Sequence, residues 1–253
     1  MRRLKRLYES SKETEYFVRM GTVSKWRHPK LHEYSKKLLK LFNAKKGALV
    51  LDAGVGTGIH AIEIAKLCDV VGLDVSREML TMTKLSIKRL NIKSIHLVLG
   101  DIQNMPFKNE AFDKVFALEH YFHVPDYYKA VSELIRSTKF GGMLLIEVFN
   151  MFHISTCLEK LSHILSEFLR KESPPYHIRT PKTILKPFQS FHFKVYGFHV
   201  LMPTWLPKVG YKFNFARKEP FFSKLGERSL FKMLGVQLVV KVIKLNKNAY
   251  AER

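Results

Sequence analysis

Cysteine is scarce in this chain of 253 residues, which contains only Cys68 and Cys157. The two lie far apart in sequence and form no Cys-x-x-Cys pair, so they indicate neither a disulfide framework nor a thiolate metal site and fit a reducing compartment. No uncharged apolar run approaches the roughly 18 residues that a membrane-spanning helix needs. No apolar stretch follows the basic N-terminal residues, so the sequence predicts no signal peptide. We expect a soluble cytoplasmic protein.

Acidic residues are outnumbered, with 22 Asp and Glu against 43 Lys and Arg, for a formal net charge of +21. The excess is unevenly spread: residues 1–46 have a net charge of +10, residues 47–150 of −1 and residues 151–253 of +12. Two basic flanks around a near-neutral centre favour an anionic partner near those flanks. A general basic bias of the source's proteins is the alternative, and both interpretations stay open.

Between the last two expected strands, residues 202–233 are expected to form a long loop, in which aromatic residues such as Trp205 alternate with basic residues such as Lys208. Loops above about 15 residues are usually functional or disordered. Aromatic and basic side chains together suit single-stranded RNA, or an amphiphilic substrate at a membrane surface. The aromatic residues could equally pack on a sheet, so the loop alone does not choose between these interpretations.

The central part of the chain alternates apolar runs of strand length with amphipathic segments of helical period. The expected strands are 48–52, 70–74, 95–99, 112–118 and 143–149, with helices beginning at Gly58, after Ser76 and at Pro125, and a turn at Gly141-Gly142. Alternation of this kind predicts right-handed crossovers and a mostly parallel sheet with helices on both faces. The remaining expected elements are helices at 31–44, 154–168 and 180–188 and strands at 193–201 and 234–245, for seven strands in all.

The most informative stretch runs from Leu49 to His60 and contains Gly54, Gly56 and Gly58 at every second position. A glycine-rich turn that leads into a helix offers a ligand backbone N–H groups and the positive end of the helix dipole. A dinucleotide-binding turn has the pattern G-x-G-x-x-G, which fails here because position 59 is Ile. Asp52, directly before the turn, would repel a pyrophosphate and would suit a positive charge or an amino group.

Two further carboxylates follow the next two strands. Asp74 ends the second strand, where a carboxylate can accept two hydrogen bonds from a ribose diol, and Asp101 follows the third strand, where it can accept from an exocyclic amine. Carboxyl ends of parallel strands share the edge at which such sheets bind ligands. A nucleoside with a free diol, an amino group and no phosphate meets these requirements.

At these residues the chain resembles the class I S-adenosylmethionine-dependent methyltransferases. The resemblance rests on five blocks that occur in order: residues 50–58, 71–76, 100–107, 112–118 and the pair Gly141-Gly142. It implies a Rossmann-like doubly wound fold. The sequence shows no internal repeat, low-complexity tract or linker, so we expect one domain over residues 1–253. In that domain 1–46 is a basic helical extension, 47–150 is the cofactor-binding core, and 151–253 holds the substrate-side helices, the basic-aromatic loop and the last strands.

The resemblance also implies roles for individual residues. The three glycines would let the backbone close on the methionine part of S-adenosylmethionine, with Asp52 near its amino group. Asp74 would take the ribose hydroxyls, and Asp101 would read the adenine together with the backbone of Ile102. Leu118 and Glu119, just past the fourth strand, would border the site of methyl transfer, and S-adenosylhomocysteine would be the product.

Residues 103–107 look most like the branch that includes ubiquinone and menaquinone biosynthesis methyltransferases, which favours a small-molecule or lipid-like acceptor. Residues 118–121 lack the Asn/Asp-Pro-Pro-Tyr/Phe motif that base-amine methyltransferases often carry. A hydroxyl or carbon acceptor would need a general base, for which His123 and His120 are the candidates. The histidines show no metal-ligand spacing, so no metal is expected.

Three hypotheses follow from these patterns. The first is a methyltransferase for a small or lipid-like acceptor. The second is an RNA methyltransferase, for example one acting on tRNA, that grips its substrate with the basic flanks. The third is a non-catalytic protein that binds the cofactor or serves as a scaffold. The sequence leaves the acceptor atom and the oligomeric state open.

Overall fold

The computed structural model describes residues 40–43, 45–118, 124–149, 179–198 and 237–245. These residues divide into two compact units. The first lies within Met1–Ala117, Asp126–Leu144 and Ile243–Arg253, and the second within Leu118–Pro125 and Leu145–Val242. The expectation of a single domain stays a prediction.

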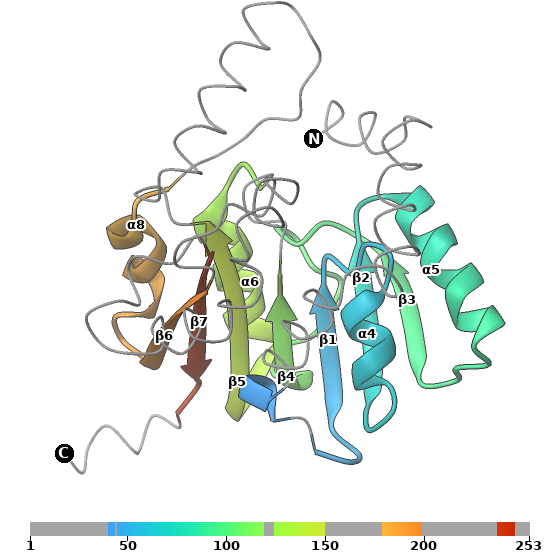
Figure 1. The fold of residues 1–253 in the computed structure, drawn as a ribbon. Coiled ribbons are helices and arrows are strands. Elements are labelled where there is room, and N and C mark those ends of the chain that lie inside the picture. Colours follow the sequence, from blue (N-terminus) through green and yellow to red (C-terminus); the bar gives the residue numbers. More distant parts are fainter. Residues whose placement is uncertain (1–39, 44, 119–123, 150–178, 199–236, 246–253) are drawn as a thin grey trace, which may run out of the picture. The chain divides into compact units, whose positions relative to one another are not determined.

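The described strands form one seven-stranded sheet in the order β3-β2-β1-β4-β5-β7-β6 (Figure 1). The strands are β1 (Leu49–Ala53), β2 (Asp69–Asp74), β3 (Ile95–Leu99), β4 (Phe112–Ala117), β5 (Thr138–Phe149), β6 (His192–Phe198) and β7 (Gln237–Ile243). β1 runs parallel to both β2 and β4, and β2 runs parallel to β3. The predicted fold class, a mostly parallel seven-stranded α/β sheet, is confirmed.

The register of the sheet brings the predicted ligand residues to one edge. Asp52 lies opposite Gly72 of β2 and Phe116 of β4, and Asp74 lies opposite Leu99 of β3. Val50 is fully buried in β1, because a central parallel strand is covered on both faces. Asp52 and Asp74 therefore occupy the carboxyl ends of adjacent strands, where ligands of open α/β sheets bind.

Three helices of the first unit cover this sheet: α4 (Ile59–Ile64), α5 (Arg77–Arg89) and α6 (Tyr127–Ser137). In Figure 1, α4 lies in front of the sheet and α6 behind it. The Ser76 hydroxyl caps α5 by accepting from the Met79 N–H at 3.2 Å, as the sequence predicts. The helix expected to open at Pro125 instead begins two residues later, because Asp126 is the residue whose side chain accepts from the first turn.

The second unit contains α8 (Pro181–Leu185) followed by the 3-10 turn η2 (Lys186–Phe188). Thr180 caps α8 through a hydrogen bond from the Thr183 N–H at 3.1 Å, and proline occupies the first turn, where its missing N–H costs nothing. Phe188 is fully buried. The helix expected over 180–188 is thus present, with its last turn tightened.

The expected turn at Gly141-Gly142 is wrong, because both glycines lie inside β5. A Cβ at Gly142 would come within 2.8 Å of the Asp113 carbonyl oxygen and 2.7 Å of that of Lys139. Gly142 is needed for the close approach of two backbones, and Gly141 for its left-handed φ of 74°, within one continuous strand. Lys244 then pairs with the same stretch, donating to the Gly142 carbonyl at 3.0 Å.

Several predicted segments fall outside the described residues: most of the helix at 31–44, the helix at 154–168, the loop at 202–233 and the ends of the last two strands. No helix in the described part of the chain has the length and apolar character to cross a membrane.

Candidate functional site

The loop between β1 and α4, residues 54–58, is held against the second strand by its backbone. The N–H groups of Gly54 and Val55 both donate to the Leu73 carbonyl, at 2.7 and 2.9 Å. Gly54, Gly56 and Gly58 all have positive φ, at 91°, 51° and 78°. Side-chain-bearing residues rarely adopt this conformation, so the alternating glycines are required by the path of the chain.

Two of these glycines differ in what surrounds them. A Cβ at Gly58 would approach the Cγ2 of Thr83 to 2.7 Å, so α5 packs directly on this point of the loop. Thr83 also donates its hydroxyl to the Gly56 carbonyl at 2.6 Å. A Cβ at Gly56, in contrast, would meet no atom within 4 Å. The loop is therefore braced from behind and open at Gly56, which leaves a cradle that a ligand can enter.

Asp74 connects this cradle to β2. Its carboxylate accepts from the Gly56 N–H at 2.8 Å and from the Ser76 N–H at 2.9 Å, one bond on each oxygen. Each oxygen keeps further acceptor capacity, which a diol can use. Burial raises the pKa of Asp74, and the backbone hydrogen bonds only partly offset that rise.

Asp52 is the second carboxylate of the site and is only 3% exposed. Burial raises its pKa well above the usual range, and the neighbouring charge of Asp74 raises the pKa further, while a hydrogen bond from the Ala61 backbone lowers it. Among the described residues, neither carboxylate forms an ion pair. Two adjacent, uncompensated carboxylates favour a ligand that brings positive charge or hydrogen-bond donors.

Asp101 and Ile102 follow β3. The Asp101 Oδ1 accepts from the Gln103 backbone N–H at 3.0 Å, and the Gln103 side-chain amide reaches both carboxylate oxygens at 3.3 Å. Ile102 is buried, and its backbone N–H donates to nothing in the described part of the chain. A free N–H beside a carboxylate offers one donor and one acceptor, the pair that an adenine edge requires.

The remaining predicted residues fall outside this group. Leu118 directly follows β4 and is buried within the second unit. Glu119, His120 and His123 lie outside the described residues, so their predicted roles remain predictions. In the part of the chain that the structure describes, no three His, Cys, Asp or Glu side chains are grouped as metal ligands.

His60 is a residue of the site region that sequence reasoning missed. Its ring packs edge-on against Phe116, with ring centroids 6.4 Å apart, and its buried Nδ1 has no hydrogen-bond partner among the described residues. Burial lowers the pKa of His60 to about 4. The signal available in the sequence was its position two residues after Gly58, in the first turn of α4.

Comparison with known proteins points to the methyltransferases. Residues 50–142 match a family described as a methyltransferase domain. The demethylmenaquinone methyltransferase of Staphylococcus haemolyticus (strain JCSC1435) is 37% identical over 116 residues, which are 44% of this chain and 48% of that protein. The chain thus matches about half the length of such curated relatives.

Solved structures share the fold across more of the chain. A methyltransferase from Thermotoga maritima, described as a possible histamine N-methyltransferase, superposes with a TM-score of 0.64 at 20% identity, covering 95% of this chain and 99% of that one. Phosphoethanolamine N-methyltransferase 2 of Haemonchus contortus, in complex with S-adenosylhomocysteine, has a TM-score of 0.62 at 21% identity, covering 85% and 53%. At these identities the likeness concerns the fold alone.

Residues 50–142 therefore match a methyltransferase domain, and the chain has the fold of solved S-adenosylmethionine-dependent methyltransferases. That domain is distantly homologous to the demethylmenaquinone methyltransferases.

Proposed function

We propose that this chain is an S-adenosylmethionine-dependent methyltransferase that modifies a small-molecule or lipid-like acceptor. The observation that carries the proposal is the pair of uncompensated carboxylates, Asp52 and Asp74, beside a glycine cradle that is open at Gly56. S-adenosylmethionine brings an ammonium group, a sulfonium and a ribose diol but no phosphate, and this combination fits two carboxylates where a dinucleotide does not.

Each described residue has a defined task in this proposal. The open backbone at Gly56 receives the methionine part, and Asp52 faces its ammonium group. Asp74 accepts from the ribose hydroxyls with its remaining lone pairs, and Asp101 accepts from the adenine amine while the Ile102 N–H donates to the ring. When bound, the cofactor supplies an electrophilic methyl group on a sulfonium.

The protein's contribution to such a transfer is mainly alignment, because an in-line displacement at a methyl group needs correct placement of donor and acceptor. The braced loop serves this purpose, since Thr83 and Leu73 fix its backbone before any ligand arrives. Leu118 and Glu119 border the transfer site in the proposal. His123 or His120 removes the proton if the acceptor is a hydroxyl or a carbon acid.

The acceptor class rests on the relatives. The first curated relatives are named demethylmenaquinone methyltransferases, and the matches cover 44% and 52% of this chain. A quinol-type or other lipid-like ring is accordingly the first acceptor to test. We also propose that the reaction takes place in the cytoplasm, in line with the free, buried Cys68 thiol.

Labelled methyl transfer tests this proposal. Purified protein is incubated with methyl-labelled S-adenosylmethionine and, in parallel, with an organic extract, total RNA and total protein of the source cells. We expect label in the organic-soluble fraction. Label that enters only RNA or protein contradicts the small-molecule acceptor, and the absence of transfer to any fraction, despite cofactor binding, favours the non-catalytic hypothesis.

RNA is the second candidate acceptor, because the net charge of +10 over residues 1–46 and +12 over 151–253 favours a polyanion. Binding of a tRNA mixture should then weaken steeply with salt, in proportion to the phosphates neutralised. A flat salt dependence, or no binding at low salt, removes this candidate.

A further inference from the structure

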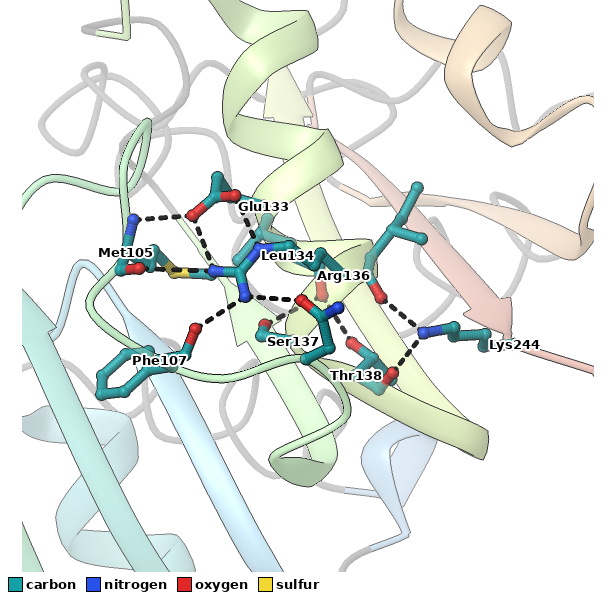
Figure 2. Close-up of polar contacts among 10 residues, drawn as sticks. Met105, Phe107, Glu133, Leu134, Arg136, Ser137, Thr138 and Lys244 are labelled. Atoms are coloured by element: carbon teal, nitrogen blue, oxygen red, sulfur yellow. Dashed lines mark hydrogen bonds and ion pairs between the residues drawn. The ribbon is translucent and has the colours of Figure 1, made fainter.

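The loop between β3 and β4, residues 100–111, contains Asp101 and Ile102 but no helix or strand. A segment without regular structure must satisfy its backbone groups elsewhere. In this loop the backbone groups of Met105 and Phe107 bond to one ion pair on α6, formed by Glu133 and Arg136, which we call the α6 clamp (Figure 2).

The two side chains of the α6 clamp hold each other in place by hydrogen bonds. Arg136 donates its Nε to the Glu133 Oε1 at 2.8 Å and its Nη2 to Oε2 at 2.9 Å, which is a two-point pairing of a planar fork with a carboxylate. The Arg136 hydrogen bond lowers the pKa of Glu133, so the carboxylate is ionised at neutral pH. Both side chains are partly buried, with 18% of Glu133 and 29% of Arg136 exposed.

The clamp holds the backbone of the loop at two positions, Met105 and Phe107. Glu133 accepts from the Met105 N–H at 2.7 Å, while Arg136 donates to the Met105 carbonyl at 3.3 Å and to the Phe107 carbonyl at 2.6 Å. The Arg136 carbonyl accepts from the Glu110 N–H at 2.9 Å. Figure 2 shows the carbonyls of Met105 and Phe107 bonded to the Arg136 guanidinium and the Met105 N–H bonded to Glu133.

A second connection ties the start of the loop to the start of α6. The Gln103 Oε1 accepts from the Asp126 N–H at 3.0 Å, while its amide nitrogen faces the Asp101 carboxylate. Asp126 is also the N-cap of α6. The orientation of the Asp101 carboxylate therefore depends on where α6 lies relative to the loop.

We propose that the Glu133–Arg136 clamp is a positioning device for base recognition: by fixing Met105 and Phe107 it sets where Asp101 and the Ile102 N–H meet the adenine. This inference rests on the proposed cofactor and extends it to residues that touch no ligand. The clamp holds the loop that carries Asp101 and Ile102, and none of its bonds reaches the glycine loop at residues 52–58, so its effect is expected on the base and not on the methionine part.

The test compares two ligands that differ only at the base. S-adenosylhomocysteine has the exocyclic amine, and S-inosylhomocysteine has a carbonyl in its place. Calorimetry gives the dissociation constant of each for wild type, Glu133→Gln and Arg136→Lys. Both substitutions keep a polar side chain of similar length but lose the charge-assisted or two-point pairing.

Lys244→Met is the matched control. Lys244 donates to the carbonyls of Ile135 and Thr138 at 3.0 and 2.7 Å, so it anchors the end of the same helix (Figure 2). Its ion pair with the loop is a long one, 3.9 Å to the Glu110 side chain, at the far end of the loop from Asp101. Asn109→Ala is a second control, because it removes only one partly exposed contact of Arg136, at 2.9 Å.

We expect both clamp variants to bind S-adenosylhomocysteine about 10-fold more weakly, the scale of one charged hydrogen bond. The preference for adenine over hypoxanthine, which is the ratio of the two dissociation constants, should fall by roughly threefold or more. Lys244→Met should unfold at lower temperature and keep the wild-type preference. An unchanged preference in the clamp variants, or an equal loss in Lys244→Met, overturns the inference. If the wild type binds neither ligand, the proposed function itself fails, and the two failures are distinguishable.

Hydrogen exchange gives an independent readout on the unliganded protein. In Glu133→Gln the Met105 amide should exchange at least about 10-fold faster, because its acceptor is weakened. Amides of β1 should keep their wild-type rates. Equal acceleration throughout the first unit would mean that the clamp only supports global stability, and would overturn the positioning role.

Discussion

The Asp74 carboxylate accepts a hydrogen bond from the Gly56 N–H at 2.8 Å and so joins the end of β2 to the middle of the glycine loop. The same carboxylate is the proposed partner of the ribose. Asp74 shapes the unliganded loop and, in the proposed function, also binds the ligand, so its loss should affect both properties.

Asp74→Ala should weaken binding of S-adenosylhomocysteine by roughly 1.5–3 kcal/mol, the scale of charge-assisted hydrogen bonds. It should also lower the free energy of unfolding by about 1–3 kcal/mol, because the N–H groups of Gly56 and Ser76 lose their acceptor. Calorimetry and urea unfolding measure the two effects. Asp69→Asn, an exposed carboxylate at the other end of β2, is the control. Unchanged cofactor affinity in Asp74→Ala would show that the ribose assignment is wrong.

Asp52→Asn should stabilise the unliganded protein at neutral and alkaline pH. The folded state raises the pKa of Asp52, so it binds the proton more tightly than the unfolded chain does. Wild-type stability is therefore lost as pH rises through the folded-state pKa, and Asn removes that loss while it can still accept from the Ala61 N–H.

We expect Asp52→Asn to raise the free energy of unfolding by about 0.5–2 kcal/mol and to weaken cofactor binding, as is usual where a site is strained for function. Thermal unfolding as a function of pH measures the gain. A variant that is less stable than wild type at pH 8 would contradict the account of Asp52 as a destabilising buried charge.

Gly58→Ala should lower the free energy of unfolding by about 2–4 kcal/mol, since it adds a left-handed alanine and a clash with the Thr83 Cγ2. Adding Thr83→Ser removes that methyl group and keeps the hydroxyl that bonds to Gly56. The double variant should recover about 1 kcal/mol in urea unfolding. Gly47 has a φ of 81° but open space around it, so Gly47→Ala should lower the free energy of unfolding only by the backbone strain. An equal cost at positions 47 and 58 would exclude the clash.

The stability of the protein should fall as pH decreases from about 6.5 to about 4, because the folded state lowers the pKa of His60 to about 4. Between these pH values the unfolded chain binds a proton at His60 that the folded protein does not bind, so the free energy of unfolding falls. Below about pH 4 both states are protonated and the free energy of unfolding falls no further. We expect the free energy of unfolding to fall by about 1–3 kcal/mol. This is less than the energy equivalent of the full pKa shift, because the side chain as a whole is not fully buried.

His60→Leu keeps an apolar contact with Phe116 and should flatten the pH dependence of the melting temperature between pH 6.5 and 4. His96→Leu, at an exposed position on β3, is the matched control and should leave the dependence as in wild type. If both variants give the wild-type curve, the loss of stability at acid pH comes from other groups.

The order of strands and helices could be predicted because its signals are local. Each strand is a short apolar run, and Ser76 and Thr180 are caps that act on residues three positions away. Gly141-Gly142 misled the prediction, because a glycine pair that permits a turn also permits close contact between strands. The contact with the Asp113 carbonyl, 29 residues away, leaves no local signal.

The carboxylates of the site could be predicted for the same reason, since parallel strands bring their ends to one edge. The residues that brace the site could not. Thr83 reaches Gly56 across 27 residues and Glu133 reaches Met105 across 28, and both look like ordinary helix residues in the sequence. Their partners depend on how α5 and α6 pack, which periodicity alone does not determine.

In the proposed function, Asp52 and Asp74 form a site for a cationic adenosyl ligand. Calorimetric titration of the wild-type protein with S-adenosylmethionine, in two buffers of different ionisation enthalpy, tests it most directly. We predict saturable one-to-one binding with release of a proton, because the bound ammonium favours the ionised form of Asp52, and we predict that Asp52→Asn abolishes the proton release. No binding, or binding without proton release at any pH, would contradict the claim.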